Sequence, residues 1–157
     1  MVRFQEEVLI GAQAATVFRL YANVAGWPDW DSEVKSAAID GAFQAGARGT
    51  LTPKGGPVAK IRVTEVTPNQ SFTVESKLPL CTMRFEHELH GAGEATRAVH
   101  RVSFHGPLSF LFGRLVGNSI RRGLPASMRG LKRASESGAP MPAPPAEPPH
   151  RVAPGAP

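Results

Sequence analysis

The sequence has 157 residues, 41% of them hydrophobic and 20% charged, which is enough for one domain with an ordinary core and too little for two. A single cysteine, Cys81, excludes an internal disulfide and a cysteine-based zinc cluster, and without a signal sequence or a ~20-residue apolar run we expect a cytoplasmic protein with no membrane span. No nucleic-acid-reading motif accompanies the formal net charge of +5, so we expect no nucleic-acid partner.

The N-terminal part of the chain predicts one strand and two helices. Residues 2–10 alternate apolar and polar side chains, broken only by Glu6, as in a strand with one covered face. Residues 12–24 have the spacing and the alanine content of a helix. Because Pro28 prevents a continuous helix, we expect a turn and then a second, short helix over residues 29–33.

The second predicted helix lies in the segment GWPDWDSEV, which holds two tryptophans. Trp27 and Trp30 are three positions apart, and we expect both to pack inward at the end of the sheet. There they could form the aromatic wall of a ligand site, or they could fill the core where the helices meet the sheet. The nearby carboxylates suit the start of a helix, where the helix dipole favours negative charge.

The middle of the chain predicts six strands separated by short turns rich in Gly, Pro and Asn. Short connections between successive strands imply an antiparallel meander. The resulting order of one strand, two helices, six strands and one long helix is that of an α+β fold, with the helices on one side of the sheet. The predicted strands cover residues 34–43, 46–52, 58–67, 71–78, 82–90 and 95–105.

The longest periodic run, residues 106–136, predicts a helix of about 45 Å. Pro125 lies inside it, so we expect a bend or break near residues 121–123. The run carries six basic residues against one acidic residue, and the whole net charge of +5 therefore lies on this helix. Leu111 and Leu115 lie beside its apolar face. The apolar face consists of Leu108, Phe112, Val116, Ile120, Leu124, Met128 and Leu131.

The C-terminal residues 137–157 are dominated by Pro, Ala and Gly and show no apolar period. Such a composition cannot bury enough apolar surface to offset the entropy of ordering. We therefore expect a disordered tail, partly of polyproline II character, and a folded domain that spans residues 1–136.

Two histidines are the candidates for chemistry. If residues 92–93 form a two-residue hairpin turn, Phe85 lies opposite His100, and His87 becomes a diagonal neighbour of His100, roughly 7 Å away on an apolar face. Two imidazoles could bind a polar head group or transfer protons near neutral pH, or each could be a hydrogen-bonded core residue. Glu65 shares the parity of inward-facing residues, but no third ligand has a suitable spacing, and we expect no metal and no cofactor.

Several segments together resemble the SRPBCC superfamily, the START-like group that includes polyketide cyclases and dehydrases and lipid-transfer domains. They are the WPDWDSEV segment, the FEHELHGAGEATRAVHRVSF hairpin and the GPLSFLFGRLVGNSIRRGLPASMRGLKRASE helix, in this element order. The resemblance covers residues 1–136 and implies a helix-grip fold, with a curved antiparallel sheet around the C-terminal helix and a cavity between them. We expect that cavity to be lined by Trp27, Trp30, Val63, Phe72, Val74, Phe85, His87, His100, Val102, Ile120, Leu124 and Met128.

Three functions are compatible with these patterns. The first is binding, with transport or sequestration, of a hydrophobic small molecule such as a lipid, an isoprenoid or an aromatic polyketide. The second is an enzyme of the cyclase or dehydratase type, with His87 and His100 as acid and base. The third is an accessory domain whose basic helix docks on an acidic partner or a membrane surface.

Overall fold

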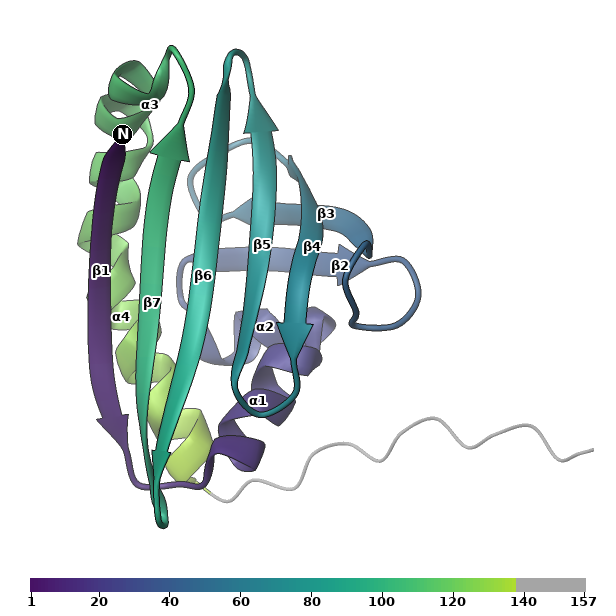
Figure 1. The fold of residues 1–157 in the computed structure, drawn as a ribbon, viewed down its shortest axis with the longest axis vertical. Coiled ribbons are helices and arrows are strands. Elements are labelled where there is room, and N and C mark those ends of the chain that lie inside the picture. Colours follow the sequence, from purple (N-terminus) through teal and green to yellow (C-terminus); the bar gives the residue numbers. More distant parts are fainter. Residues whose placement is uncertain (138–157) are drawn as a thin grey trace, which may run out of the picture.

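The computed structural model describes residues 1–137, which form one seven-stranded antiparallel sheet with helices packed on one side of it (Figure 1). The strand order is β1-β7-β6-β5-β4-β3-β2, a meander whose last strand pairs with the first, and it confirms the predicted α+β helix-grip fold. The predicted tail, apart from Ser137, lies outside the described residues. The elements are β1 (Val2–Ile10), α1 (Ala14–Ala22), η1 (Val24–Gly26), α2 (Trp27–Trp30), β2 (Val34–Ile39), β3 (Arg48–Pro53), β4 (Ala59–Thr67), β5 (Ser71–Leu78), β6 (Cys81–Ala92), β7 (Ala95–His105), α3 (Ser109–Leu115) and α4 (Gly117–Glu136).

Two predicted elements have different bounds in the structure. The short helix covers Trp27–Trp30 and not residues 29–33, because Pro28 occupies the first turn, where its missing N–H is not needed. Strand β2 ends at Ile39, earlier than predicted. Soon after it, Gly41 has a φ of 77°, a left-handed conformation that interrupts the extended backbone.

The hairpin of β6 and β7 has a different register from the predicted one. Its turn residues are Gly93 and Glu94, so that Ala92 pairs with Ala95 and His87 lies directly opposite His100. Gly93 has a φ of 65°, the positive value that the first central residue of a type II′ turn requires. The predicted diagonal placement of the two histidines was therefore wrong. Moving the turn by one residue changes which residues are opposite each other by two positions, and because side chains alternate with a period of two, both histidines stay on the same face.

Glu65 faces outward, contrary to the inward placement that its parity allowed. The pairing of β4 with β5 is irregular between Val63 and Glu65, as in a β-bulge, which changes the direction of the side chains that follow. Glu65 is exposed and contacts Arg84 on the outer face of the sheet at 3.5 Å.

The C-terminal helix is interrupted at Val116, between α3 and α4, and the predicted break near residues 121–123 is absent. Helix α4 runs on through Pro125. Proline removes one backbone hydrogen bond here, but Leu124 and Met128 beside it are buried, and this packing holds the helix together. Tertiary contacts thus decide where the long helix breaks.

Small residues on α4 let the segment after α2 lie directly on the helix. A Cβ added to Gly130 would lie 1.8 Å from the Trp30 carbonyl oxygen, so only glycine fits at this position. Three residues before Gly130, Ser127 Oγ donates a hydrogen bond to Asp31 Oδ1 at 2.6 Å. Burial raises the pKa of Asp31, while the bond from Ser127 opposes that shift. This contact joins α2 to the middle of α4.

The inner face of the sheet holds two groups of buried hydrophobic side chains. The smaller group, called the second cluster below, consists of Cys81, Met83, Val102 and Phe104, with Phe85, Phe112, Val116 and Ile120 among the partly buried side chains packed against it. The larger group, called the first cluster, consists of Ile10, Val17, Phe18, Tyr21, Val24, Trp27, Trp30, Val34, Ala37, Ala47, Ile61, Val63, Phe72, Val74, Leu89, Ala98, Met128 and Leu131.

Candidate functional site

A row of polar side chains crosses the inner face between the two clusters. The row consists of Glu6, His100 and His87, which are paired across β1, β7 and β6. The inner-face pairs of β6 and β7 are Met83 with Phe104, Phe85 with Val102, His87 with His100, and Leu89 with Ala98. The first two pairs belong to the second cluster and the last pair belongs to the first cluster, so the polar row marks the boundary.

The two histidine rings are in direct contact. Their centroids are 4.5 Å apart with an interplanar angle of 72°. The Tyr21 hydroxyl, from α1, shares a hydrogen bond of 2.7 Å with His100 Nε2. On the other side, Phe72 of β5 stacks on His87 with a centroid distance of 3.9 Å and an interplanar angle of 7°. Three strands and one helix therefore position the histidine pair.

Burial keeps these groups neutral at physiological pH. It lowers the pKa of His100 to about 3 and is the main reason that the pKa of His87 lies well below its ordinary value, to which the neighbouring His100 also contributes. Burial likewise raises the pKa of Tyr21. Neutral imidazole has one donor and one acceptor nitrogen, so both histidines are suited to hydrogen bonding and not to holding a charge.

One nitrogen of the pair has no partner. His87 Nδ1 is buried and has no hydrogen-bond partner of good geometry within residues 1–137, although an interaction of the His87 ring with the Phe72 backbone partly opposes the lowering of its pKa. A buried polar atom without a partner costs about 1–3 kcal/mol, and such an atom in a folded protein calls for an explanation. His87 as a whole is only half-buried, so part of its ring remains accessible although this nitrogen is buried.

Leu124 is the helix residue at the level of the polar row. Ile120, one turn before it, packs against the second cluster, and Met128, one turn after it, belongs to the first cluster. Leu124 is only 7% exposed but joins neither of these clusters of described residues. Leu124 is therefore the buried helix residue that lies between the two clusters.

Nine of the twelve predicted lining residues belong to or pack against one of the two clusters, and His87, His100 and Leu124 lie between them. Six of the nine, Trp27, Trp30, Val63, Phe72, Val74 and Met128, are in the first cluster, and Phe85, Val102 and Ile120 are in or against the second. Trp27 Nε1 donates a hydrogen bond to the Tyr21 carbonyl oxygen at 3.0 Å, which favours its interpretation as a core plug. The structure brings together Phe72, His87 and His100.

Two members of the site were missed by sequence reasoning. Tyr21 lies within the helix predicted over residues 12–24, and helical periodicity does not show whether a hydroxyl has a partner. Glu6 could have been found from the sequence, because it is the single residue that breaks the alternation of β1. In the structure it is half-buried on the inner face. Within residues 1–137, no three His, Cys, Asp or Glu side chains are placed to hold a metal ion.

A curled antiparallel sheet around a long C-terminal helix, with a few polar groups on an otherwise apolar inner face, defines a helix-grip protein. The chain belongs to the family described as polyketide cyclase / dehydrase and lipid transport, whose model matches residues 1–136. No curated protein matches the sequence. No helix among the described residues is long and apolar enough to span a membrane.

Solved structures share this fold at low sequence identity. Protein MLL2253 from Mesorhizobium loti has a TM-score of 0.71 at 16% identity, with 87% of this chain and 98% of that chain covered. The Zhui aromatase/cyclase from Streptomyces sp. R1128 has a TM-score of 0.69 at 17% identity, with 86% and 93% covered. The truncated norcoclaurine synthase from Thalictrum flavum has a TM-score of 0.65 at 16% identity, with 84% and 91% covered. At these identities the likeness establishes the fold alone.

Proposed function

We propose that this protein binds a hydrophobic small molecule that carries one hydroxyl, phenol or carbonyl group, between the sheet and α4 at the level of Leu124. The observation that carries the proposal is the unpaired, buried His87 Nδ1 at the boundary between two apolar clusters. A polar group of a ligand would supply the missing hydrogen bond, while its apolar body would lie against the adjacent hydrophobic side chains.

Binding agrees better with the electrostatics than acid–base catalysis does. A general base works best when its pKa lies near the operating pH, and a His100 pKa of about 3 makes this imidazole a weak base at neutral pH. The cyclase or dehydratase alternative rests on the family and on enzymes with the same fold. It would require a bound substrate to move the pKa of His87 or His100 toward neutrality.

The variant His87→Phe tests the proposal. Phenylalanine keeps the stacking on Phe72 but has no unpaired nitrogen, so the free protein should become more stable by roughly 1–3 kcal/mol. The same variant should lose roughly tenfold in affinity for long-chain alcohols and aromatic phenols, because the ligand hydroxyl then has no partner. Thermal unfolding and isothermal titration with a panel of these compounds would measure both effects. Loss of stability without any change in affinity would contradict the proposal.

The position of the ligand is tested separately by enlarging the side chain at Leu124. Leu124→Trp should abolish binding and leave the protein folded, as judged by circular dichroism. Leu115→Trp is the matched control, because Leu115 is on the exposed side of the same C-terminal region and its variant should bind normally. Turnover of an aromatic polyketide that disappears in both His87→Ala and His100→Ala would favour the enzyme. Binding that survives both changes would favour the carrier.

A further inference from the structure

We propose that the end of the molecule formed by α3 and the β5–β6 turn docks on an anionic lipid bilayer. This surface is distinct from the polar row and does not depend on the ligand proposed above. We call it the α3 patch and define it by Leu80, Phe110, Leu111, Arg114 and Leu115.

The α3 patch exposes large apolar side chains. Phe110 is 65% exposed, Leu111 38% and Leu115 68%, although sequence periodicity placed Leu111 and Leu115 beside the buried face of a longer helix. Leu80 in the β5–β6 turn is 69% exposed. Scattered exposed hydrophobic residues are ordinary, but several on adjoining elements mark an interaction surface.

The turn and the helix are adjoining. Leu108 N, at the start of α3, donates a hydrogen bond to the Leu80 carbonyl oxygen at 3.3 Å. A Cβ added to Gly106 would lie 2.6 Å from the same oxygen, which shows how closely the two segments approach. Figure 1 places α3 and the β5–β6 turn at the same end of the molecule, opposite the end where α1 begins.

Leu80 is also an unusual residue for its backbone conformation. Its φ is 50°, in the left-handed region that bulky side chains avoid. In the β4–β5 turn the comparable conformation, with a φ of 62°, is adopted by Asn69, a residue type that tolerates it. Folding alone would favour Asn or Gly at position 80, so an exposed leucine there points to a function in contact with an apolar partner.

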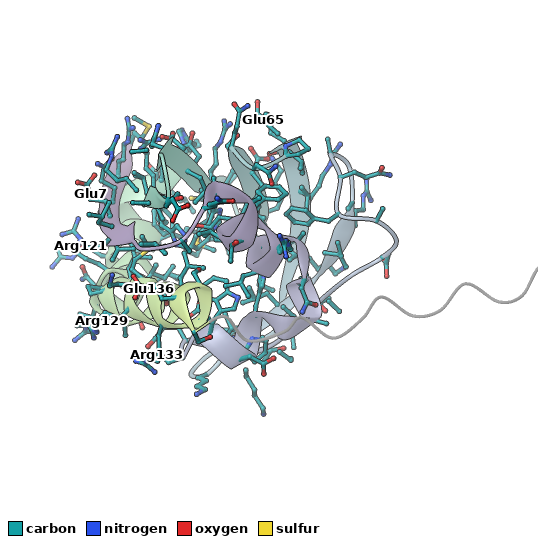
Figure 2. The ribbon with its side chains drawn as sticks, turned by 90° about the horizontal axis from the view of Figure 1, so that it is seen from below. Glu7, Glu65, Arg121, Arg129, Arg133 and Glu136 are labelled. Atoms are coloured by element: carbon teal, nitrogen blue, oxygen red, sulfur yellow. The ribbon has the colours of Figure 1, made fainter. Side chains whose placement is uncertain are left out.

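Arginines without an ion pair lie beside the apolar side chains. Arg114 lies on α3 itself, and Arg121 and Arg122 follow in the first turns of α4; none of these three forms an ion pair with another described residue. Arg129 and Arg133 also point outward from α4 (Figure 2), but they lie farther along the helix, toward the opposite end of the molecule. No acidic residue occurs between Glu94 and Glu136.

An anionic bilayer matches both parts of this surface. Apolar side chains at the tips of short elements can enter the boundary between head groups and acyl chains, and each nearby arginine gains from the negative surface potential. An acidic protein partner would match the arginines and leave Leu80, Phe110 and Leu115 in water. The bilayer therefore accounts for more of the observations.

Co-sedimentation of the full chain with phosphatidylcholine vesicles, with and without phosphatidylglycerol, tests the proposal. We expect binding to the anionic vesicles only, and weaker binding at high salt. The double variant Phe110→Ser/Leu115→Ser should bind roughly tenfold less tightly or worse, because two apolar side chains no longer enter the bilayer. Arg114→Gln/Arg122→Gln should reduce the salt dependence.

Leu9→Ser and Val58→Ser are matched controls, since Leu9 is 63% and Val58 62% exposed on other parts of the surface. Both should bind vesicles like the parent. The proposal is overturned if the parent binds no anionic vesicle, or if the controls lose as much affinity as the patch variant. It is also overturned if size-exclusion chromatography shows that Phe110→Ser/Leu115→Ser converts a dimer into a monomer while vesicle binding persists, because a second copy would then cover the patch.

Discussion

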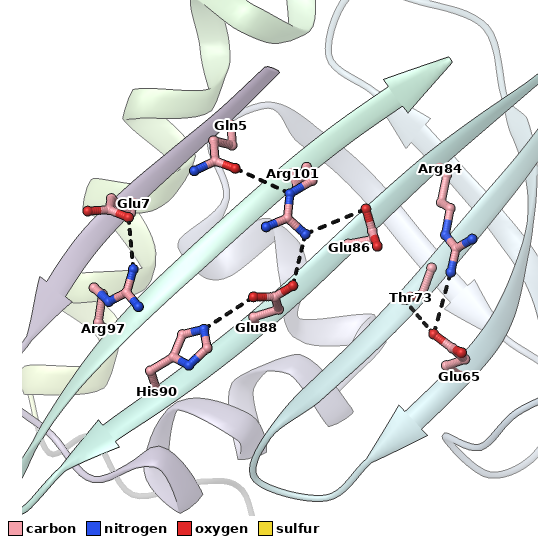
Figure 3. A network of polar contacts seen from close by, with 10 residues as sticks. All are labelled: Gln5, Glu7, Glu65, Thr73, Arg84, Glu86, Glu88, His90, Arg97 and Arg101. Carbon is pink, nitrogen blue, oxygen red and sulfur yellow. Dashed lines mark hydrogen bonds and ion pairs between the residues drawn. The ribbon is translucent and has the colours of Figure 1, made fainter. Parts of the chain in front are cut away.

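The polar side chains on the two faces of the sheet differ in their exposure to water and in their charge. On the outer face, charged side chains of β1, β4, β6 and β7 form a ladder of ion pairs at the surface (Figure 3). Arg97 contacts Glu7 at 3.1 Å, and Arg101 contacts Glu88 at 2.8 Å. On the inner face, the polar groups are few, burial keeps His87 and His100 neutral, and two buried nitrogens, His87 Nδ1 and Trp30 Nε1, have no hydrogen-bond partner among residues 1–137.

Polar groups on the two faces therefore differ in how much the loss of a partner lowers the free energy of unfolding. An ion pair in contact with water contributes about 0–1 kcal/mol, because solvent screens it and can replace either partner. A buried imidazole has no such replacement, so it must be neutral, hydrogen-bonded, or compensated by a ligand. Polar residues on the inner face thus point to function more strongly than the larger number on the outer face.

The largest expected effect is acid destabilisation through the inner histidines. In the unfolded chain His100 titrates near its ordinary pKa of 6.5, whereas burial lowers its pKa in the folded protein to about 3. The unfolded state therefore takes up the proton first, so stability is complete above about pH 6.5 and is lost progressively as the pH falls toward 3. His100 alone should account for a loss on the order of 3–5 kcal/mol, to which His87 adds.

Urea unfolding over this pH range would measure the loss. His100→Gln should flatten the profile, because the group whose pKa burial lowers has been removed. A parent protein whose stability does not vary below pH 6.5 would refute the burial of both imidazoles.

A smaller loss should follow from adding one methyl group between α4 and α2. Gly130→Ala would place a Cβ 1.8 Å from the Trp30 carbonyl oxygen, so the backbone must shift. We expect a net destabilisation of about 1–3 kcal/mol, even though alanine is the better helix former. Thermal unfolding compared with Asn118→Ala, at an exposed position of α4, would check it. A gain in stability would mean that α2 and α4 are farther apart than described.

Loss of the Tyr21 hydroxyl should have an effect of similar or slightly smaller size. Tyr21→Phe keeps the ring in the first cluster but leaves His100 Nε2 without its partner at 2.7 Å. The expected cost is about 1–3 kcal/mol by urea unfolding. In a His100→Leu background the same change should cost little, and the double-mutant cycle isolates the pair. Equal costs in both backgrounds would show that the hydroxyl acts elsewhere.

The smallest effect is expected on the outer face. Arg97→Gln removes an ion pair in which both side chains are about half exposed, and the loss should be about 0–1 kcal/mol and should vanish at high salt. Urea unfolding at low and high salt would measure it. A loss of unfolding free energy as large as that of Tyr21→Phe would show that exposed ion pairs on the outer face matter as much as buried hydrogen bonds on the inner face.

The sequence alone determined the order of the elements and, in strands without a bulge, the face on which a residue lies. The alternation in β6 and β7 placed His87 and His100 on one inner face, and this survived an error in the turn, because the pleat has a period of two along each strand. The same parity argument failed at Glu65, where a bulge adds a residue that local alternation does not reveal.

The tertiary structure decided which of these residues meet. Whether His87 lies opposite His100, whether Tyr21 reaches it from α1, and whether the long helix breaks at Val116 or at Pro125 all depend on contacts between segments distant in sequence. The exposure of Leu111 and Leu115 has the same origin, because periodicity identifies an apolar face but cannot say how much of it the sheet covers. Side-chain direction is a local property of the backbone, whereas burial and partnership are properties of the whole fold.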